Sequence, residues 1–316
     1  MRRPRLIDAG FSVIVEEMRR MGVDPAGVDI MGEKGRHLLI RLDDVDLRAA
    51  LILKQDMLSL GGEAALRREA ASLKVSSTPV LLMGTALQVR RLAEKLPSQP
   101  FKLSALAGPL KELVEGLGTD ARFLVGDRNL LEGGKKAVMG ILNVTEDSFS
   151  DGGRYLSVDA AVSRGLEMLD EGADIIDVGG ESTRPGAVPV SEDVEAERVV
   201  PVIRELAAEG RGVLSVDTTK SSVARKALEA GASIINDISG LAFDPFMGGV
   251  AAETGASVIL MHTRGRPETM QDDLEYGDLM GEICSCLERA MDKAMEAGTD
   301  RERICVDPGI GFGKSP

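Results

Sequence analysis

Residues 171–180 read EGADIIDVGG, and the pattern returns at 230–240, AGASIINDISG, and at 254–263, TGASVILMHT. Each stretch has Gly-Ala near its start, continues through branched apolar residues and ends in polar or glycine-rich sequence. RGVLSVDTT (211–219) and RICVDPGIGFGK (303–314) share the second half of the pattern. The apolar residues are consecutive rather than alternating, which is typical of parallel strands buried on both faces. The repeat therefore predicts a parallel sheet.

Helical patterns separate these strands. SVDAAVSRGLEMLDEG (157–172) carries apolar residues on one helical face and a glycine just past its predicted end, and SSVARKALEAG (221–231) repeats the arrangement. Strand, polar loop, helix, glycine and strand make up the repeating unit of βα folds. A doubly wound sheet and a (β/α)₈ barrel both fit this unit. The barrel is favoured because the predicted strands end in polar side chains, and in a barrel all those ends meet at one rim that holds the active site.

The predicted strands fall short of a closed barrel. An eight-stranded barrel would need two further βα units, on the order of 60 residues. We therefore expect a TIM (β/α)₈-type barrel with about six βα units present, and we interpret the chain as C-terminally incomplete. The six predicted strands lie near 137–143, 174–180, 213–217, 233–236, 257–261 and 303–307.

The first part of the chain lacks this rhythm. Residues 38–62 and 78–96 suggest a small α/β domain, with a strand that ends near Met83 and a helix from about Ala86 to Leu96. We predict an N-terminal α/β extension of unknown role over residues 1–118 and a barrel domain over 119–316.

Two connecting segments lie between these patterns. KLPSQPFKLSALAGPL (95–110) contains three prolines and is interpreted as the exit from the first domain. RFLVGDRNLLEGGK (122–135) is interpreted as a hairpin that leads into the first barrel strand.

Composition restricts the class of protein. The chain has 316 residues, of which 43% are hydrophobic, enough for a large core. Its net charge of −13 supplies no basic surface for a nucleic-acid backbone. No apolar run reaches the ~18 residues of a membrane span, and the 3 cysteines and 2 histidines have neither zinc spacing nor a disulfide framework. We predict a cytoplasmic protein that acts on small molecules, with no nucleic-acid or membrane partner.

Two long polar loops follow predicted strands. In GILNVTEDSFSDGG (140–153), Asn143 stands at the strand end, where its amide oxygen could face a hard cation. In GGESTRPGA (179–187), Arg184 stands between a threonine and a proline and could bind phosphate or carboxylate in bidentate fashion. Either loop alone would more simply be read as solvated surface, but loops at this end of a barrel concentrate functional residues.

Carboxyl and amide side chains end three further strands. Asp217 and Asp307 directly follow apolar runs and need hydrogen-bond donors to stay charged there. They could be acid–base groups, metal ligands or acceptors for a ligand rich in N–H groups, and caps of the following helices are the structural alternative. Asn236 both donates and accepts, which suits the edge of an amide-like heterocycle. His262 is at least as readily a packed side chain, and PGIGFGK (308–314) lacks the spacing of a phosphate-binding loop.

Taken together, these segments resemble the dihydropteroate synthase family over roughly residues 120–316. The resemblance implies a transferase that joins p-aminobenzoate to 6-hydroxymethyl-7,8-dihydropterin diphosphate. Dihydropteroate and pyrophosphate would be released, with Mg²⁺ assisting. Six motifs in order carry the resemblance: GILNVTEDSFSDGG, GGESTRPGA, SVDTTK, IINDISG, MHTRGRPETMQ and DPGIGFGK.

The resemblance also implies roles for individual residues. Asp217, Asn236 and Asp307 would hold the N–H and amino groups of the pterin ring, and Asn143 would be the metal ligand at the pyrophosphate end. The catalytic set implied in this way is Asn143, Thr183, Arg184 and Asp217. The further substrate contacts implied are Phe149, Thr183, Arg184, Pro185, Phe312 and Lys314.

The sequence departs from the family pattern at two places. Glu146 stands where the family has proline, and the family continues past GFGK with strands that end in Ser-Arg-Lys and near Arg-x-His. We therefore expect residues 1–316 alone to show no dihydropteroate synthesis and to fold poorly or self-associate, whereas the complete protein could form a homodimer. Two alternatives stay open, a methyltetrahydrofolate–corrinoid methyltransferase and a non-catalytic pterin-binding fragment.

Overall fold

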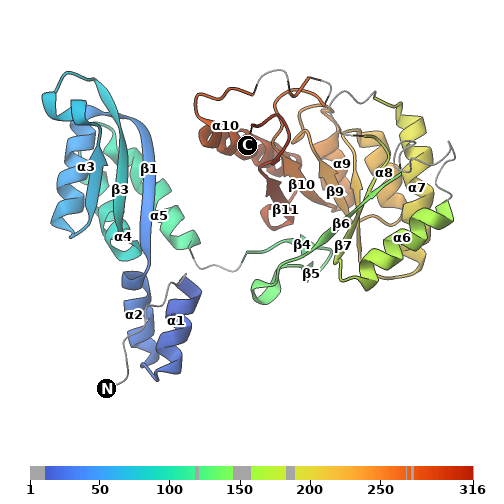
Figure 1. The fold of residues 1–316 in the computed structure, drawn as a ribbon, viewed down its shortest axis with the longest axis horizontal. Coiled ribbons are helices and arrows are strands. Elements are labelled where there is room, and N and C mark those ends of the chain that lie inside the picture. Colours follow the sequence, from blue (N-terminus) through green and yellow to red (C-terminus); the bar gives the residue numbers. More distant parts are fainter. Residues whose placement is uncertain are drawn as a thin grey trace. The chain divides into compact units, whose positions relative to one another are not determined.

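The computed structural model describes residues 11–117, 121–144, 158–182, 189–267, 269–271 and 274–315. The chain divides into two compact units, Met1–Thr119 and Asp120–Pro316, and each is described by itself (Figure 1). No helix in the described part of the chain is long and apolar enough to cross a membrane.

The first unit is a three-stranded antiparallel sheet with helices, in the strand order β1-β3-β2. Its helix α4 begins with a reciprocal cap, in which the Thr85 hydroxyl accepts from the Gln88 backbone N–H and the Gln88 side chain accepts from the Thr85 N–H. The sheet and its helices confirm the predicted small α/β region. Its elements are α1 (Phe11–Arg20), α2 (Pro25–Gly35), β1 (His37–Asp46), α3 (Leu47–Ser59), β2 (Glu63–Leu66), β3 (Ser77–Thr85), α4 (Ala86–Lys95) and α5 (Ala107–Gly116).

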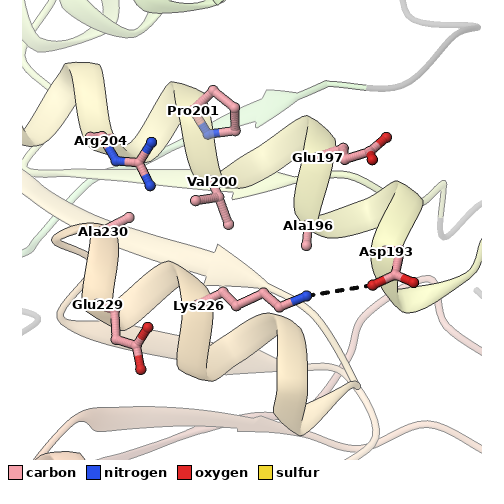
Figure 2. A pocket seen from close by; sticks show the side chains of 9 residues that line it. All are labelled: Asp193, Ala196, Glu197, Val200, Pro201, Arg204, Lys226, Glu229 and Ala230. Carbon is pink, nitrogen blue, oxygen red and sulfur yellow. Dashed lines mark ion pairs between the residues drawn. The ribbon is translucent and has the colours of Figure 1, made fainter.

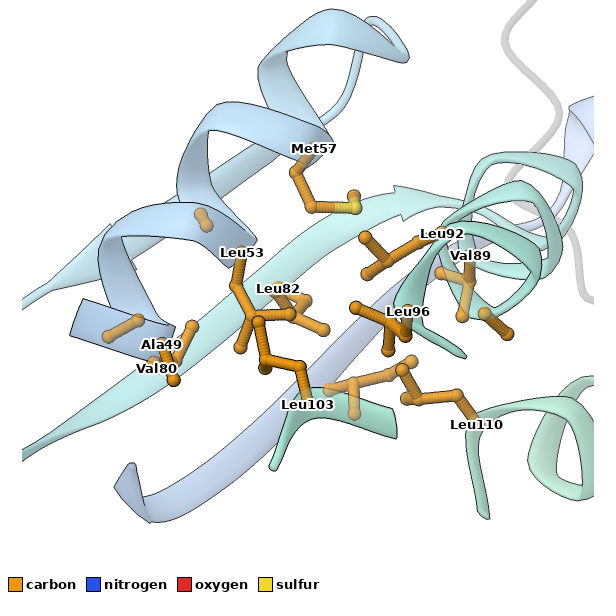
Figure 3. Close-up of a cluster of buried hydrophobic side chains, with 14 of the residues drawn as sticks. Ala49, Leu53, Met57, Val80, Leu82, Val89, Leu92, Leu96, Leu103 and Leu110 are labelled. Carbon is orange, nitrogen blue, oxygen red and sulfur yellow. The ribbon is translucent and has the colours of Figure 1, made fainter. Parts of the chain in front are cut away.

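The core of this unit lies between the sheet and its helices, as Figure 3 shows. The residues of this core show that the interpretation of residues 95–110 as an exit from the domain is wrong. Leu96, Leu103 and Leu110 are buried in that core, so this segment belongs to the unit itself. The prolines shorten the local helices, but three leucines at seven-residue spacing still supply apolar side chains that gain free energy by burial.

The second unit is built on six parallel strands, as predicted (Figure 1). The strands neighbour one another in chain order, β11-β10-β9-β8-β7-β6, and each observed strand begins and ends within two residues of its predicted position. The strands are β6 (Met139–Asn143), β7 (Ile175–Gly179), β8 (Val213–Asp217), β9 (Ile234–Asp237), β10 (Ser257–Met261) and β11 (Ile304–Asp307). The helices between them are α6 (Val158–Asp170), α7 (Glu192–Ala208), α8 (Ser221–Ala230), α9 (Met247–Thr254) and α10 (Leu279–Ala297).

Glycines end two of these helices. Gly231 follows α8 with φ +121, and Gly298 follows α10 with φ +111. Residues with a side chain rarely adopt such backbone angles, so glycine at these positions stops the helix and turns the chain toward the next strand.

The two faces of the sheet carry different side chains. One face packs against the helices through branched residues such as Ile176, Val216 and Leu260. Near the amino ends of the strands, the other face packs Ile175 and Ile234 against a hairpin formed by β4 (Leu124–Val125) and β5 (Arg128–Asn129), which confirms the predicted hairpin. The apolar contacts of this face thus gather at the amino ends of the strands.

Candidate functional site

Along the carboxyl ends of β6 to β9, three polar side chains and one glycine lie in one row. Asn143 of β6 is paired in register with Gly179 of β7, Gly179 with Asp217 of β8, and Asp217 with Asn236 of β9. Asp307 ends β11 opposite Met261 of β10. The sheet therefore brings three residues expected at the site, Asn143, Asp217 and Asn236, to one level of the same rim.

Gly179 leaves open the space between two of these side chains. A methyl group at Gly179 would lie 3.4 Å from Asp217 Oδ2 and 3.6 Å from Asn143 Oδ1. Two side-chain oxygen atoms of the kind that bind hard cations thus face the same position above β7. In the described part of the chain no group of three or more His, Cys, Asp or Glu side chains could hold a metal ion.

Asp177 of β7 is a buried carboxylate that the sequence reasoning did not select. Its side chain is 3% exposed, and its Oδ2 accepts a hydrogen bond of 2.8 Å from Asn236 Nδ2. Burial raises the pKa of Asp177, while nearby hydrogen-bonding groups of Ser215 and Asn236 oppose the shift. The sequence could have indicated Asp177 through its position in IIDVGG. It lies two residues before Gly179, and residues two apart in a strand point to the same face of the sheet.

Asp217 has the most perturbed environment of the row. The side chain is half-buried, and desolvation raises its pKa well above the ordinary range. The negative charges of Asp177, Glu195 and Asp237 raise it further. A ligand that donates hydrogen bonds to this carboxylate would therefore relieve both the lost hydration and the repulsion.

Asp307 is tied to the loop that follows it. Its Oδ1 accepts a hydrogen bond of 2.7 Å from the Gly309 N–H, so one oxygen closes a turn after the strand and does not cap a helix among the described residues. Gly309 has φ +67, and a Cβ there would lie 2.1 Å from the His262 carbonyl oxygen. Only glycine fits this approach, which holds Asp307 beside the end of β10.

His262 and Lys314 are engaged mainly by the backbone. The buried His262 donates its N–H to the Asp307 carbonyl at 2.9 Å, and burial, followed by the charge of Lys314, lowers the imidazole pKa. Lys314 Nζ donates to the carbonyls of His262, Gly309 and Phe312 at 3.1, 2.9 and 2.8 Å. In this structure Lys314 therefore stabilises the loop after β11, and the half-buried Phe312 belongs to the same loop.

A buried ion-pair cluster lies beside the rim and was also missed from the sequence. Lys220 Nζ donates to Glu181 Oε2 and to Glu195 Oε2, and Glu181 Oε2 accepts from the Val190 N–H as well. The side chain of Glu195 is 1% exposed. Burial works against the charge of Lys220, but the hydrogen bonds to the two glutamates outweigh it and raise the pKa of Lys220. The cluster fixes the segments that follow β7 and β8.

Four expected site residues lie outside the described residues, namely Phe149, Thr183, Arg184 and Pro185. The substitution at Glu146 lies outside them as well. Their predicted roles stay predictions.

A separate groove lies on the outer surface of the unit, between α7 and α8 (Figure 2). It encloses about 680 Å³, and an ion pair of 3.5 Å between Lys226 and Asp193 crosses it. None of its lining residues belongs to the polar row at the strand ends. The groove is therefore distinct from the candidate site.

Comparison with known proteins identifies the family of the second unit. Residues 139–316 match the family model described as "Pterin binding enzyme". The chain belongs to the pterin-binding enzyme family. The matched region contains the complete row at the strand ends together with Asp307.

Individual members of the pterin-binding family show the same similarity. A dihydropteroate synthase of Bacillus subtilis is 54% identical over 57% of this chain and 61% of its own length. A solved dihydropteroate synthase of Xanthomonas albilineans with 4-aminobenzoic acid is 45% identical, with a TM-score of 0.56 over 62% of this chain and 69% of that one. This likeness confirms the expected barrel-type fold.

The first unit is also found in a relative. A probable bifunctional folylpolyglutamate synthase/dihydropteroate synthase of Halobacterium salinarum is 44% identical over 95% of this chain. That match covers 36% of the relative's length. The chain thus spans about a third of the relative from Halobacterium salinarum and about three fifths of the one from Bacillus subtilis.

Proposed function

We propose that the whole protein is a dihydropteroate synthase, which condenses 6-hydroxymethyl-7,8-dihydropterin diphosphate with p-aminobenzoate. The observation that carries the proposal is the row of Asn143, Asp217 and Asn236 at the rim of a pterin-binding family member. Similarity to dihydropteroate synthases on both sequence and structure supports it.

The charges of the rim suit the pterin end of the substrate. A pterin ring presents several N–H donors, and the half-buried Asp217 and Asp307 offer acceptor oxygens at the strand ends. Asn236 offers an amide that can both donate and accept. In this proposal these three residues bind and orient the ring, with Asp307 using the oxygen that does not accept from Gly309.

The opposite end of the row suits the diphosphate. Asn143 Oδ1 faces the space above Gly179, and an amide oxygen of this kind would suit Mg²⁺ beside a diphosphate. When bound, Mg²⁺ neutralises charge that develops on the leaving pyrophosphate. Asn143 would hold the metal in this proposal.

The reaction then requires positioning rather than a protein nucleophile. The amine of p-aminobenzoate attacks the methylene carbon of the pterin as the bond from that carbon to the diphosphate oxygen breaks, and the amine releases a proton. We assign Thr183 and Arg184, with Phe149 and Pro185, to the p-aminobenzoate end on the strength of the motif resemblance alone. Orientation of the two reactants accounts for much of the rate gain in such a displacement.

The test is incorporation of labelled p-aminobenzoate into dihydropteroate by the purified whole protein with Mg²⁺ and pterin diphosphate. We expect turnover that is abolished by omission of the pterin diphosphate and that falls at least tenfold in Arg184→Ala without a change in melting temperature. Turnover of methyltetrahydrofolate with a corrinoid protein, in place of p-aminobenzoate incorporation, would overturn the proposal.

A further inference from the structure

The hydrogen bond between Asp177 and Asn236 joins two strands that are not neighbours in the sheet. Asp177 lies on β7 and Asn236 on β9, with β8 between them. In the pairing register Asp177 is level with Ser215, and Asn236 is level with Asp217, two residues further along β8. Strands of a barrel are tilted, so side chains of alternate strands reach a common layer. Asp177 thus lies directly beneath the rim.

This contact decides which way the amide of Asn236 points. A carboxylate can only accept hydrogen bonds, so it selects the orientation in which Asn236 Nδ2 faces Asp177 Oδ2 at 2.8 Å. The reversed amide would place Asn236 Oδ1 against a carboxylate oxygen, and two acceptors repel. The amide oxygen of Asn236 is therefore directed elsewhere, and no described residue donates to it.

The remaining polar atoms of this layer have no partners outside it. Ser215 is a hydrogen-bonding neighbour that lowers the pKa of Asp177, and neither Asp177 Oδ1 nor Ser215 Oγ, both buried, has any further partner among the described residues. Apolar side chains such as Ile175 and Ile234 fill the layers below. A valine at position 177 would avoid the desolvation of a carboxylate, so the packing of the sheet gives no reason for aspartate there.

We propose that Asp177 is a positioning residue for pterin binding, which acts through Asn236. By holding Nδ2, Asp177 makes Asn236 present its oxygen as an acceptor and its second amide hydrogen as a donor, in a fixed order. A pterin edge that carries an N–H donor opposite Oδ1 is then accepted, and an edge with an acceptor at that place is rejected. This inference rests on the proposed pterin-binding function of the rim.

The test is a double-mutant cycle on the binding of 6-hydroxymethylpterin, followed by calorimetry. Asp177→Ala removes the acceptor, Asn236→Ala removes the amide, and Asp177→Asn keeps an oxygen that can still accept from Nδ2. We expect Asp177→Ala to weaken binding about tenfold, on the order of one hydrogen bond to a charged group. Asp177→Asn should stay within about threefold of the wild type.

The coupling separates positioning from a structural role. In the Asn236→Ala background, Asp177→Ala should change the affinity less than about twofold, because the amide through which Asp177 acts is already absent. The inference is wrong if each single variant loses affinity tenfold and the double variant loses it about a hundredfold. It is also wrong if Asp177→Ala binds 6-hydroxymethylpterin like the wild type. Neither outcome would count against pterin binding itself. If the wild type itself fails to bind 6-hydroxymethylpterin, the proposed function fails first. A measurement without ligand also applies: the side-chain amide protons of Asn236 should exchange faster in Asp177→Ala, and unchanged exchange would contradict the contact.

Discussion

Replacing Lys220 by methionine tests how strongly the buried ion-pair cluster holds the loops beside the rim. Methionine keeps the length and the apolar part of the side chain and removes only the ammonium group. The change leaves Glu195 with a buried carboxylate whose Oε2 loses its charged partner, and its Oε1 already has no partner among the described residues.

The size of the effect follows from burial. Removing one partner of a buried ion pair costs about 3–5 kcal/mol, because the other charge stays without compensation. The Lys220 side chain is 20% exposed and that of Glu181 is 23% exposed, so water can partly reach the cluster and the lower end applies. We expect the free energy of unfolding to fall by about 3 kcal/mol. For a unit of this size that corresponds to a melting temperature about 6–12 °C lower.

The assay is urea denaturation of both proteins at pH 7, with Lys226→Met as the matched control. Lys226 makes a similar pair with Asp193, but the two side chains are 49% and 89% exposed, so its loss should cost less than about 1 kcal/mol. Adding Glu195→Gln to Lys220→Met should recover part of the loss. The reasoning is refuted if Lys220→Met and Lys226→Met destabilise equally.

Three further outcomes follow from the same structure. Because the pKa of Asp217 is raised, its contribution to the free energy of unfolding is fully present below the ordinary carboxyl pKa near 3.8 and is lost as the pH rises through the raised value. Asp217→Asn should therefore be more stable than the wild type by about 1 kcal/mol at pH 8, with the difference vanishing near pH 4, and a less stable variant at pH 8 would speak against the repulsion. Gly179→Ala places a methyl group between Asn143 and Asp217 at ordinary contact distances, so the affinity for pterin diphosphate in the presence of Mg²⁺ should drop tenfold or more while the melting temperature stays within a few degrees; unchanged affinity would mean that the diphosphate end does not use this space. Since β6 and β11 end the sheet and Val306 is 42% exposed on β11, residues 1–316 should self-associate in light scattering and Val306→Lys should shift them toward monomer, whereas a monomeric wild type would refute it.

The sequence allowed the barrel strands and most of the rim to be predicted, because both follow from local patterns. Consecutive branched residues mark β7 to β10, and a polar residue directly after such a run must lie at a strand's carboxyl end. Asn143, Asp217, Asn236 and Asp307 were found in this way. That Asn143, Asp217 and Asn236 share one row needed the additional knowledge that the strands pair in parallel and in chain order.

Other features depend on contacts that no local pattern encodes. The bond between Asp177 and Asn236 spans 59 residues of sequence and arises from the tilt of the strands. The pairs of Lys220 with Glu181 and Glu195 span 39 and 25 residues. Lys314 was expected at the substrate on the basis of its motif, and its contact with the His262 carbonyl, 52 residues away in sequence, forms only when the loop after β11 lies beside the end of β10.

Binding of 6-hydroxymethylpterin to wild-type protein and to Asp307→Asn, measured by calorimetry, tests the central claim most directly. The claim is that the carboxyl ends of these strands hold a pterin ring through its N–H groups. Asparagine preserves the shape of Asp307, but where its NH₂ group replaces an acceptor oxygen, an N–H of the ligand is left opposed, at a cost of about 1–3 kcal/mol. Asp300→Asn, on an exposed carboxylate of the turn before β11, is the control. We predict that Asp307→Asn binds about 5- to 150-fold more weakly and that Asp300→Asn binds like the wild type. Equal affinity in all three proteins, or no binding by the wild type, would contradict the account.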